Sequence, residues 1–90
     1  MKTLPNDIKL YRRTPIFTHE NVPQGWLKNH STKKDVWGLI KIMEGKLEYI
    51  IETDETFLLE PGKDGVIEPE VIHHIKLIGP VVFFVEFYKN

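Results

Sequence analysis

Short segments rich in β-branched and aromatic residues recur along the chain, separated by turn-forming residues. Helical spacing of apolar residues at i, i+3 and i+4 is never sustained. Roughly seven or eight such segments predict an all-β fold, either a sandwich or a barrel. A barrel removes the strand edges that a flat sheet of this composition would expose to other chains. We therefore expect residues 1–90 to form a single β-barrel domain.

The clearest predicted hairpin lies where Glu44 and Gly45 separate two β-rich segments, residues 36–43 and 46–52. Gly45 can supply the positive φ that a two-residue hairpin turn requires. The sequence therefore predicts that the chain reverses direction at this point.

A second turn is predicted at Gly79 and Pro80, between strands at residues 73–78 and 81–88. The last of these strands is apolar on both faces, apart from Glu86. A strand of this kind lies inside a two-layer structure or is covered by another subunit. We therefore expect a homodimer in which a second copy covers the outer face of this strand.

Charge and hydropathy limit the classes of partner. Twelve Lys and Arg against thirteen Asp and Glu leave a net charge of −1, whereas nucleic acid favours a clustered basic surface. Residues 1–10 lack the apolar run of a signal peptide, and the longest apolar stretch, residues 81–85, is too short to span a bilayer. We expect a cytoplasmic protein with no nucleic-acid or membrane partner.

Two of the four histidines lie where strands begin, which places them at the mouth of a barrel. His30 comes before the strand at residues 36–43, and His73 begins a strand after Pro69. The chain has no cysteine, so a metal site must use nitrogen and oxygen ligands. His73 and His74 are adjacent and point to opposite faces of a strand, so only one of them can enter the barrel.

Glu86 is the candidate for a third ligand, because it interrupts an otherwise apolar strand. A buried carboxylate is costly unless it is paired with a cation, a metal or good donors. Two imidazoles and one carboxylate with open positions suit a divalent metal ion, with zinc as first choice and iron or nickel as alternatives. The alternative is that Glu86 pairs with Arg12 or Arg13.

A metal-free anion site is the competing hypothesis. Thr32 and Lys33, beside His30, can present a hydroxyl and an ammonium group to a small oxyanion or carboxylate. Arg12 and Arg13 face opposite sides of their strand, and we assign Arg13 to the ligand. No nucleophile elbow, phosphate-binding loop or dinucleotide fingerprint is present, so the sequence specifies no reaction.

Several motifs, in order, resemble the small TehB/YeaR-like cupin family. These motifs are Tyr11-Arg12-Arg13-Thr14-Pro15, His30-Ser31-Thr32-Lys33, Val36-Trp37-Gly38, Met43-Glu44-Gly45-Lys46-Leu47 and Val85-Glu86-Phe87-Tyr88. The family includes the domain that precedes a methyltransferase in some tellurite-resistance TehB proteins. The resemblance implies a cupin-type jelly-roll barrel with a link to tellurite resistance, and we do not carry over the methyltransferase activity.

The resemblance to the wider cupin pattern also implies which metal ligands are replaced. His30 takes the place of the first histidine of the usual first motif, and Gly45 takes the place of its glycine. Thr32 stands where the second histidine would be, and Gly38 stands where the glutamate would be. Two of the four usual ligands are therefore missing.

The second cupin motif is matched by Pro69 and His73, which is why we expect His73 rather than His74 to enter the barrel. In this comparison Glu86 would restore a third ligand from a different strand. A small cupin-type enzyme, such as a dioxygenase or an isomerase, is the third hypothesis, because the sequence identifies neither a substrate nor a general base.

Overall fold

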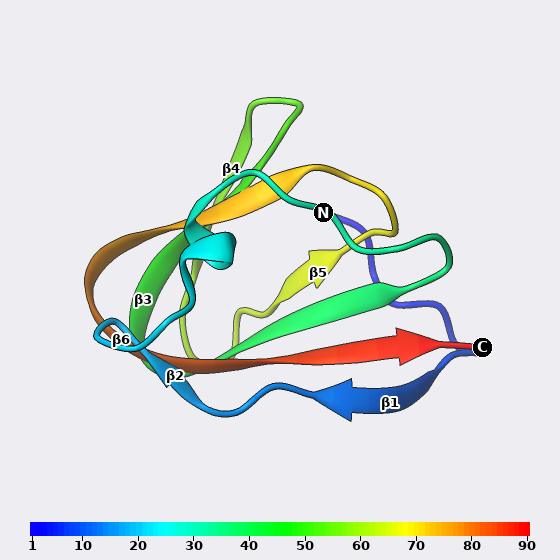
Figure 1. Ribbon diagram of the computed structural model, residues 1–90, viewed down its shortest axis with the longest axis horizontal. Helices are drawn as coiled ribbons and strands as arrows, with labels where there is room; N and C mark the ends of the chain where they lie inside the picture. Colours follow the sequence, from blue (N-terminus) through cyan, green and yellow to red (C-terminus); the bar gives the residue numbers. More distant parts are fainter.

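Two long antiparallel strands form the centre of the sheet in the computed structural model, which describes residues 1–90 (Figure 1). β3 (Trp37–Ile51) and β6 (His73–Lys89) pair along nearly their whole lengths. Four shorter strands extend this pair: β1 (Lys9–Arg13) and β2 (Phe17–Thr18) beside β6, and β4 (Glu55–Leu59) and β5 (Gly65–Ile67) beside β3. No helix of the structure has the length and apolar character needed to cross a membrane.

The hairpin predicted at Glu44 and Gly45 is wrong. β3 runs through these two residues without reversing, and β6 likewise runs through Gly79 and Pro80. The register between the two strands shifts on each side of Glu44 and Gly45. These residues therefore form an irregularity at which a continuous pair of strands bends, rather than a turn between two strands.

The close approach of the two strands explains why a glycine occupies position 45. Gly45 has a φ of 79°, and a Cβ atom placed on it would lie 2.1 Å from the carbonyl oxygen of Pro80. No L-amino acid with a side chain fits this geometry without moving the backbone. Gly45 therefore marks a bend in a two-stranded ladder and not the turn that the sequence predicted.

The bend brings the two halves of the β3–β6 pair face to face around one apolar core. Eleven buried residues form this core: Ile40, Ile42, Leu47, Tyr49, Ile51, Leu59, Ile67, Ile75, Val81, Phe83 and Val85. One short 3-10 helix, η1 (Gln24–Leu27), lies beside the sheet (Figure 1). Its Trp26 and Leu27 pack against the core. The all-β, cupin-type jelly-roll fold predicted from the sequence is confirmed.

The outer face of β6 carries the alternate residues that point away from this core. Val82, Phe84 and Tyr88 are half-buried there, and Glu86 among them is paired with Arg13 of β1. The face is therefore apolar with its central charge neutralised. A patch of this kind is suited to an isologous contact, in which the same surface of two identical chains meets across a two-fold axis.

We expect a second copy of the chain to cover this face, so light scattering at micromolar concentrations should give the mass of a dimer. Phe84→Glu would place a second carboxylate beside the Arg13–Glu86 pair and leave the contact with a net negative charge, so the mass should fall to that of a monomer. Leu58→Glu is the matched control, because Leu58 is 44% exposed on β4, a different strand. A wild-type chain that is monomeric at tens of micromolar would contradict the prediction.

Candidate functional site

His30 and His73 are held side by side by their own backbones. The amide of each donates a hydrogen bond to the carbonyl of the other, at 2.9 and 2.8 Å. Residues that exchange both hydrogen bonds are directly opposite in an antiparallel pair, so their side chains project from the same face. The two imidazole centroids are consequently only 4.3 Å apart.

The two imidazoles also hold the proton on the same ring nitrogen. Nδ1 of His30 lies 2.8 Å from the carbonyl of Lys28, and Nδ1 of His73 lies 2.9 Å from the carbonyl of Val71. A carbonyl oxygen only accepts, so Nδ1 carries the proton in both rings. In the neutral form each Nε2 therefore keeps a free lone pair. Nε2 of His73 is buried and has no hydrogen-bond partner.

Burial keeps His73 uncharged. Its side chain is 1% exposed, and burial lowers the pKa of His73 to about 4, with His30 and His74 acting in the same direction. The structure thus buries the histidine that we expected to enter the barrel. His74 points to the other face of the strand and bonds Asn29.

Trp26 of η1 lies against the histidine pair. Its ring meets that of His30 edge to face, with centroids 4.9 Å apart, and it lies 6.4 Å from the ring of His73. On its other side it faces the ring of Phe87 at 6.4 Å and 27°. The indole of Trp26 therefore lies next to both imidazoles and to the ring of Phe87.

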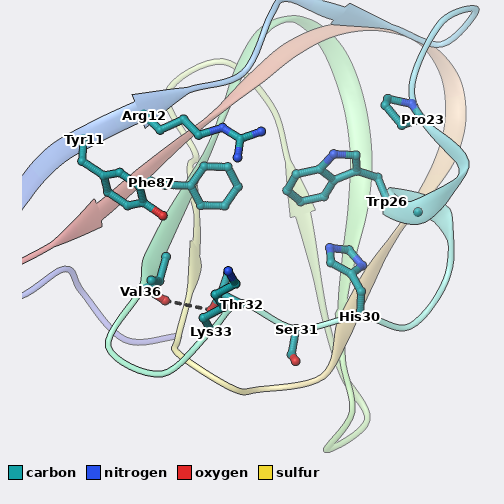
Figure 2. Close-up of a pocket in the computed structure, with 11 residues that line it drawn as sticks. Tyr11, Arg12, Pro23, Trp26, His30, Ser31, Thr32, Lys33, Val36 and Phe87 are labelled. Atoms are coloured by element: carbon teal, nitrogen blue, oxygen red, sulfur yellow. Dashed lines mark hydrogen bonds between the residues drawn. The ribbon is translucent and has the colours of Figure 1, made fainter.

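A pocket of about 440 Å³ opens on the outer side of these rings (Figure 2). It is lined by Tyr11, Arg12, Pro23, Gly25, Trp26, His30, Ser31, Thr32, Lys33, Val36 and Phe87. The lining contains two cationic side chains and no carboxylate. Residues 30–33, which the sequence singled out, all line it.

The arginine in this pocket is Arg12 and not Arg13, which corrects the sequence-based assignment. Arg12 is opposite Phe87 in the β1–β6 register, and its guanidinium lies 5.7 Å from the centre of that ring. Figure 2 shows the guanidinium reaching past Phe87 toward Trp26. Arg13 is opposite Glu86 and faces the outer side of the sheet.

Glu86 is paired with Arg13 rather than placed beside the histidines. Nε of Arg13 donates to Oε2 of Glu86 at 3.0 Å, and the hydroxyl of Tyr88 donates to Oε1 at 3.0 Å. Both carboxylate oxygens are thereby occupied on the outer face of β6. Glu86 therefore pairs with an arginine, which was the alternative to a metal-binding role, and it does not lie beside His30 and His73.

The two positions at which cupins usually carry further ligands are occupied by other interactions. The hydroxyl of Thr32 donates to the carbonyl of Val36 at 2.8 Å and closes the loop before β3. A Cβ atom on Gly38 would lie 2.9 Å from Cδ1 of Ile67, so that position has no room for a longer side chain. No group of three or more His, Cys, Asp or Glu side chains in the structure could hold a metal ion.

The pocket residues that the sequence did not assign to a site include Arg12, Trp26 and Phe87. Trp26 lies in a Pro- and Gly-containing segment that we predicted to be mostly loop. Phe87 looked like one more apolar residue of the last strand. The half-burial of Trp26 and Phe87 beside a cationic side chain would indicate a binding site. It results from tertiary contacts, which the sequence alone does not show.

Fold and site together define a small jelly-roll β protein with a ligand-sized pocket beside a pair of histidines, of which His73 is buried. Similar folds are found in the crystal structure of a protein from E. coli (strain K12), with a TM-score of 0.89, 24% identity and coverage of 98% of this chain and 96% of that one. The chain belongs to the TehB-like domain family, which it matches over residues 12–85.

Two further comparisons concern longer proteins. The chain is 25% identical over 82 residues to the probable S-adenosyl-L-methionine-dependent methyltransferase TehB of Haemophilus influenzae, covering 84% of this chain and 29% of that protein. The crystal structure of TehB from Haemophilus influenzae has a TM-score of 0.83 at 24% identity, covering 94% of this chain and 32% of that one. The chain thus spans about a third of the length of these relatives.

The neutral state of His73 makes folding stability depend on pH. Between pH 6.5 and about 4 the unfolded chain binds a proton that the folded chain does not, so stability should fall by roughly 3 kcal/mol as the pH drops through this window. Urea titrations of metal-free protein at several pH values would measure this loss. His73→Asn keeps a donor for the Val71 carbonyl and should flatten the profile, whereas His19→Asn, at an exposed histidine, should not. Equal slopes in all three proteins would contradict the prediction.

Proposed function

We propose that the chain is a binding module for a small anion, held in the pocket beside His30. The observation that carries this proposal is the charge of the lining: Arg12 and Lys33 are its ionised side chains at neutral pH, and no carboxylate faces them. Neither cation belongs to any of the five ion pairs of the molecule. Unpaired cations that converge on a pocket are the usual means of fixing an anionic ligand.

The family relationship suggests which anions to test. TehB-like proteins are linked to tellurite resistance, so tellurite is the first oxyanion to examine. A carboxylate presents the same negative oxygens and could use the same two cations. Ser31 lies in the same wall, whereas the hydroxyl of Thr32 is already donated to the carbonyl of Val36 and is not available to an anion.

Arg12→Gln should raise the Kd of a bound anion by about 10- to 100-fold, because a charge-assisted hydrogen bond is lost. Lys33→Gln should act in the same direction with a smaller effect. Thermal-shift screening with tellurite, selenite, phosphate and small carboxylates would find the ligand, and calorimetry would measure its affinity.

Arg13→Gln is the matched control, since it removes the same charge from the neighbouring residue on the opposite face of the sheet. It should leave anion affinity unchanged, although it removes a partner of Glu86. If Arg12→Gln and Arg13→Gln have equal effects, the anion does not bind in this pocket.

A divalent metal ion at His30 and His73 is a second candidate, supported by the two free Nε2 lone pairs and by the unpartnered, buried Nε2 of His73. The donor set fits a metal only in part. Zinc takes four ligands, and this chain offers two. Water or the bound anion would have to complete the coordination, and a bound metal would then polarise that anion.

Elemental analysis of untagged protein after reconstitution with zinc, iron or nickel should give about one metal per chain if this second candidate is correct. His30→Ala and His73→Ala should each reduce the metal content to near zero, with thermal melts confirming that the variants are folded. Glu86→Gln should retain the metal, because Glu86 is paired with Arg13 on the outer face. A reconstituted wild type without metal would exclude the site, and a loss caused by Glu86→Gln would contradict the two-histidine arrangement.

A further inference from the structure

The pocket is much larger than an inorganic oxyanion. Its volume is about 440 Å³, within the range of roughly 300–1,000 Å³ that is typical of sites for organic ligands. A water molecule occupies about 30 Å³ in the liquid, so an ion with three oxygens fills on the order of 100 Å³. A bare oxyanion on Arg12 would leave most of this space to water.

The remaining space is bounded by aromatic rings. The rings of Trp26 and Phe87 are within 27° of parallel, and both side chains are only half-buried by the rest of the chain. Tyr11, 47% exposed, adds a third ring to the wall. Exposed aromatic surface that lines a concave site is favourable for an apolar ligand, because binding removes both surfaces from water.

The position of Arg12 connects the polar and the aromatic parts of the pocket. Its guanidinium lies 5.7 Å from the centre of the Phe87 ring and extends toward Trp26 (Figure 2). An anionic group bound to Arg12 is therefore next to the aromatic wall. The part of the ligand attached to that anionic group can then pack along these rings.

We propose that the pocket takes an organic carboxylate with a flat, apolar or aromatic body, whose carboxylate binds Arg12 and whose body packs on Trp26 and Phe87. This inference rests on the proposed anion-binding function, because it uses the same arginine. It adds that the ligand is recognised by its apolar body as well as by its charge.

Calorimetric titration with acetate, benzoate, 2-naphthoate, the neutral 2-naphthamide and tellurite separates the two contributions. Affinity should rise at least tenfold from acetate to 2-naphthoate, since each step buries more apolar surface. It should fall at least tenfold from 2-naphthoate to 2-naphthamide, which has the same body without the charge.

Phe87→Leu should reduce the advantage of 2-naphthoate over acetate, because it removes a ring from the aromatic wall. Phe84→Leu is the matched control, because it removes an aromatic ring from the same strand on the opposite face. Trp26→Phe provides a second, conservative change in the wall that keeps an aromatic ring against the core and should weaken 2-naphthoate in the same way.

The outcomes distinguish this inference from the function on which it rests. If tellurite or acetate binds as tightly as 2-naphthoate, and Arg12→Gln weakens both, the anion site is correct and the aromatic inference is wrong. If none of the five probes binds, or if Arg12→Gln leaves 2-naphthoate binding unchanged, the anion site itself is overturned together with the inference. Equal effects of Phe87→Leu and Phe84→Leu would also reject the proposed wall.

Discussion

The antiparallel pairing of β3 and β6 is the interaction on which the rest of the structure depends. Every other strand is hydrogen-bonded to one of these two, and their shared bend brings the two halves of the pair around the core. The bend requires backbone contact between Gly45 and Pro80, which no side chain at position 45 would allow. His73, the first residue of β6, pairs through its backbone with His30, and this pairing places the two histidines side by side.

Strand alternation divides the polar residues of β1 and β6 between two faces. Arg12 and Phe87 face the pocket, and Arg13 and Glu86 face the outer side of the sheet. The irregularity at Tyr11 decides this division, because the register shifts between Leu10 and Arg12. An unshifted ladder would turn Arg13 inward and Arg12 outward, since moving a strand by one residue exchanges its faces.

This shift explains how much of the site could be predicted from the sequence. The segment that contains His30 and Lys33 was predicted to lie at the barrel mouth because it precedes a strand; it lines the pocket, and its role in binding stays a prediction. Arg12 and Arg13 could not be told apart, because a bulge of one residue leaves no mark in an exposed, mixed segment. The all-β class was predictable from short apolar segments, but Gly45 has the signature of a hairpin turn and of a bend alike.

Electrostatics connects the two candidate ligands and ranks them. Both imidazoles hold their proton on Nδ1, and burial lowers the pKa of His73 to about 4, so that ring contributes no charge near neutral pH. A divalent cation on His30 would add two positive charges to a pocket wall that already holds Arg12 and Lys33. With no carboxylate in that wall and Glu86 paired elsewhere, such a cation lacks a protein counter-charge. A bound anion would supply the counter-charge for both side-chain cations and for a metal, which is why we rank the proposed anion site above the metal site.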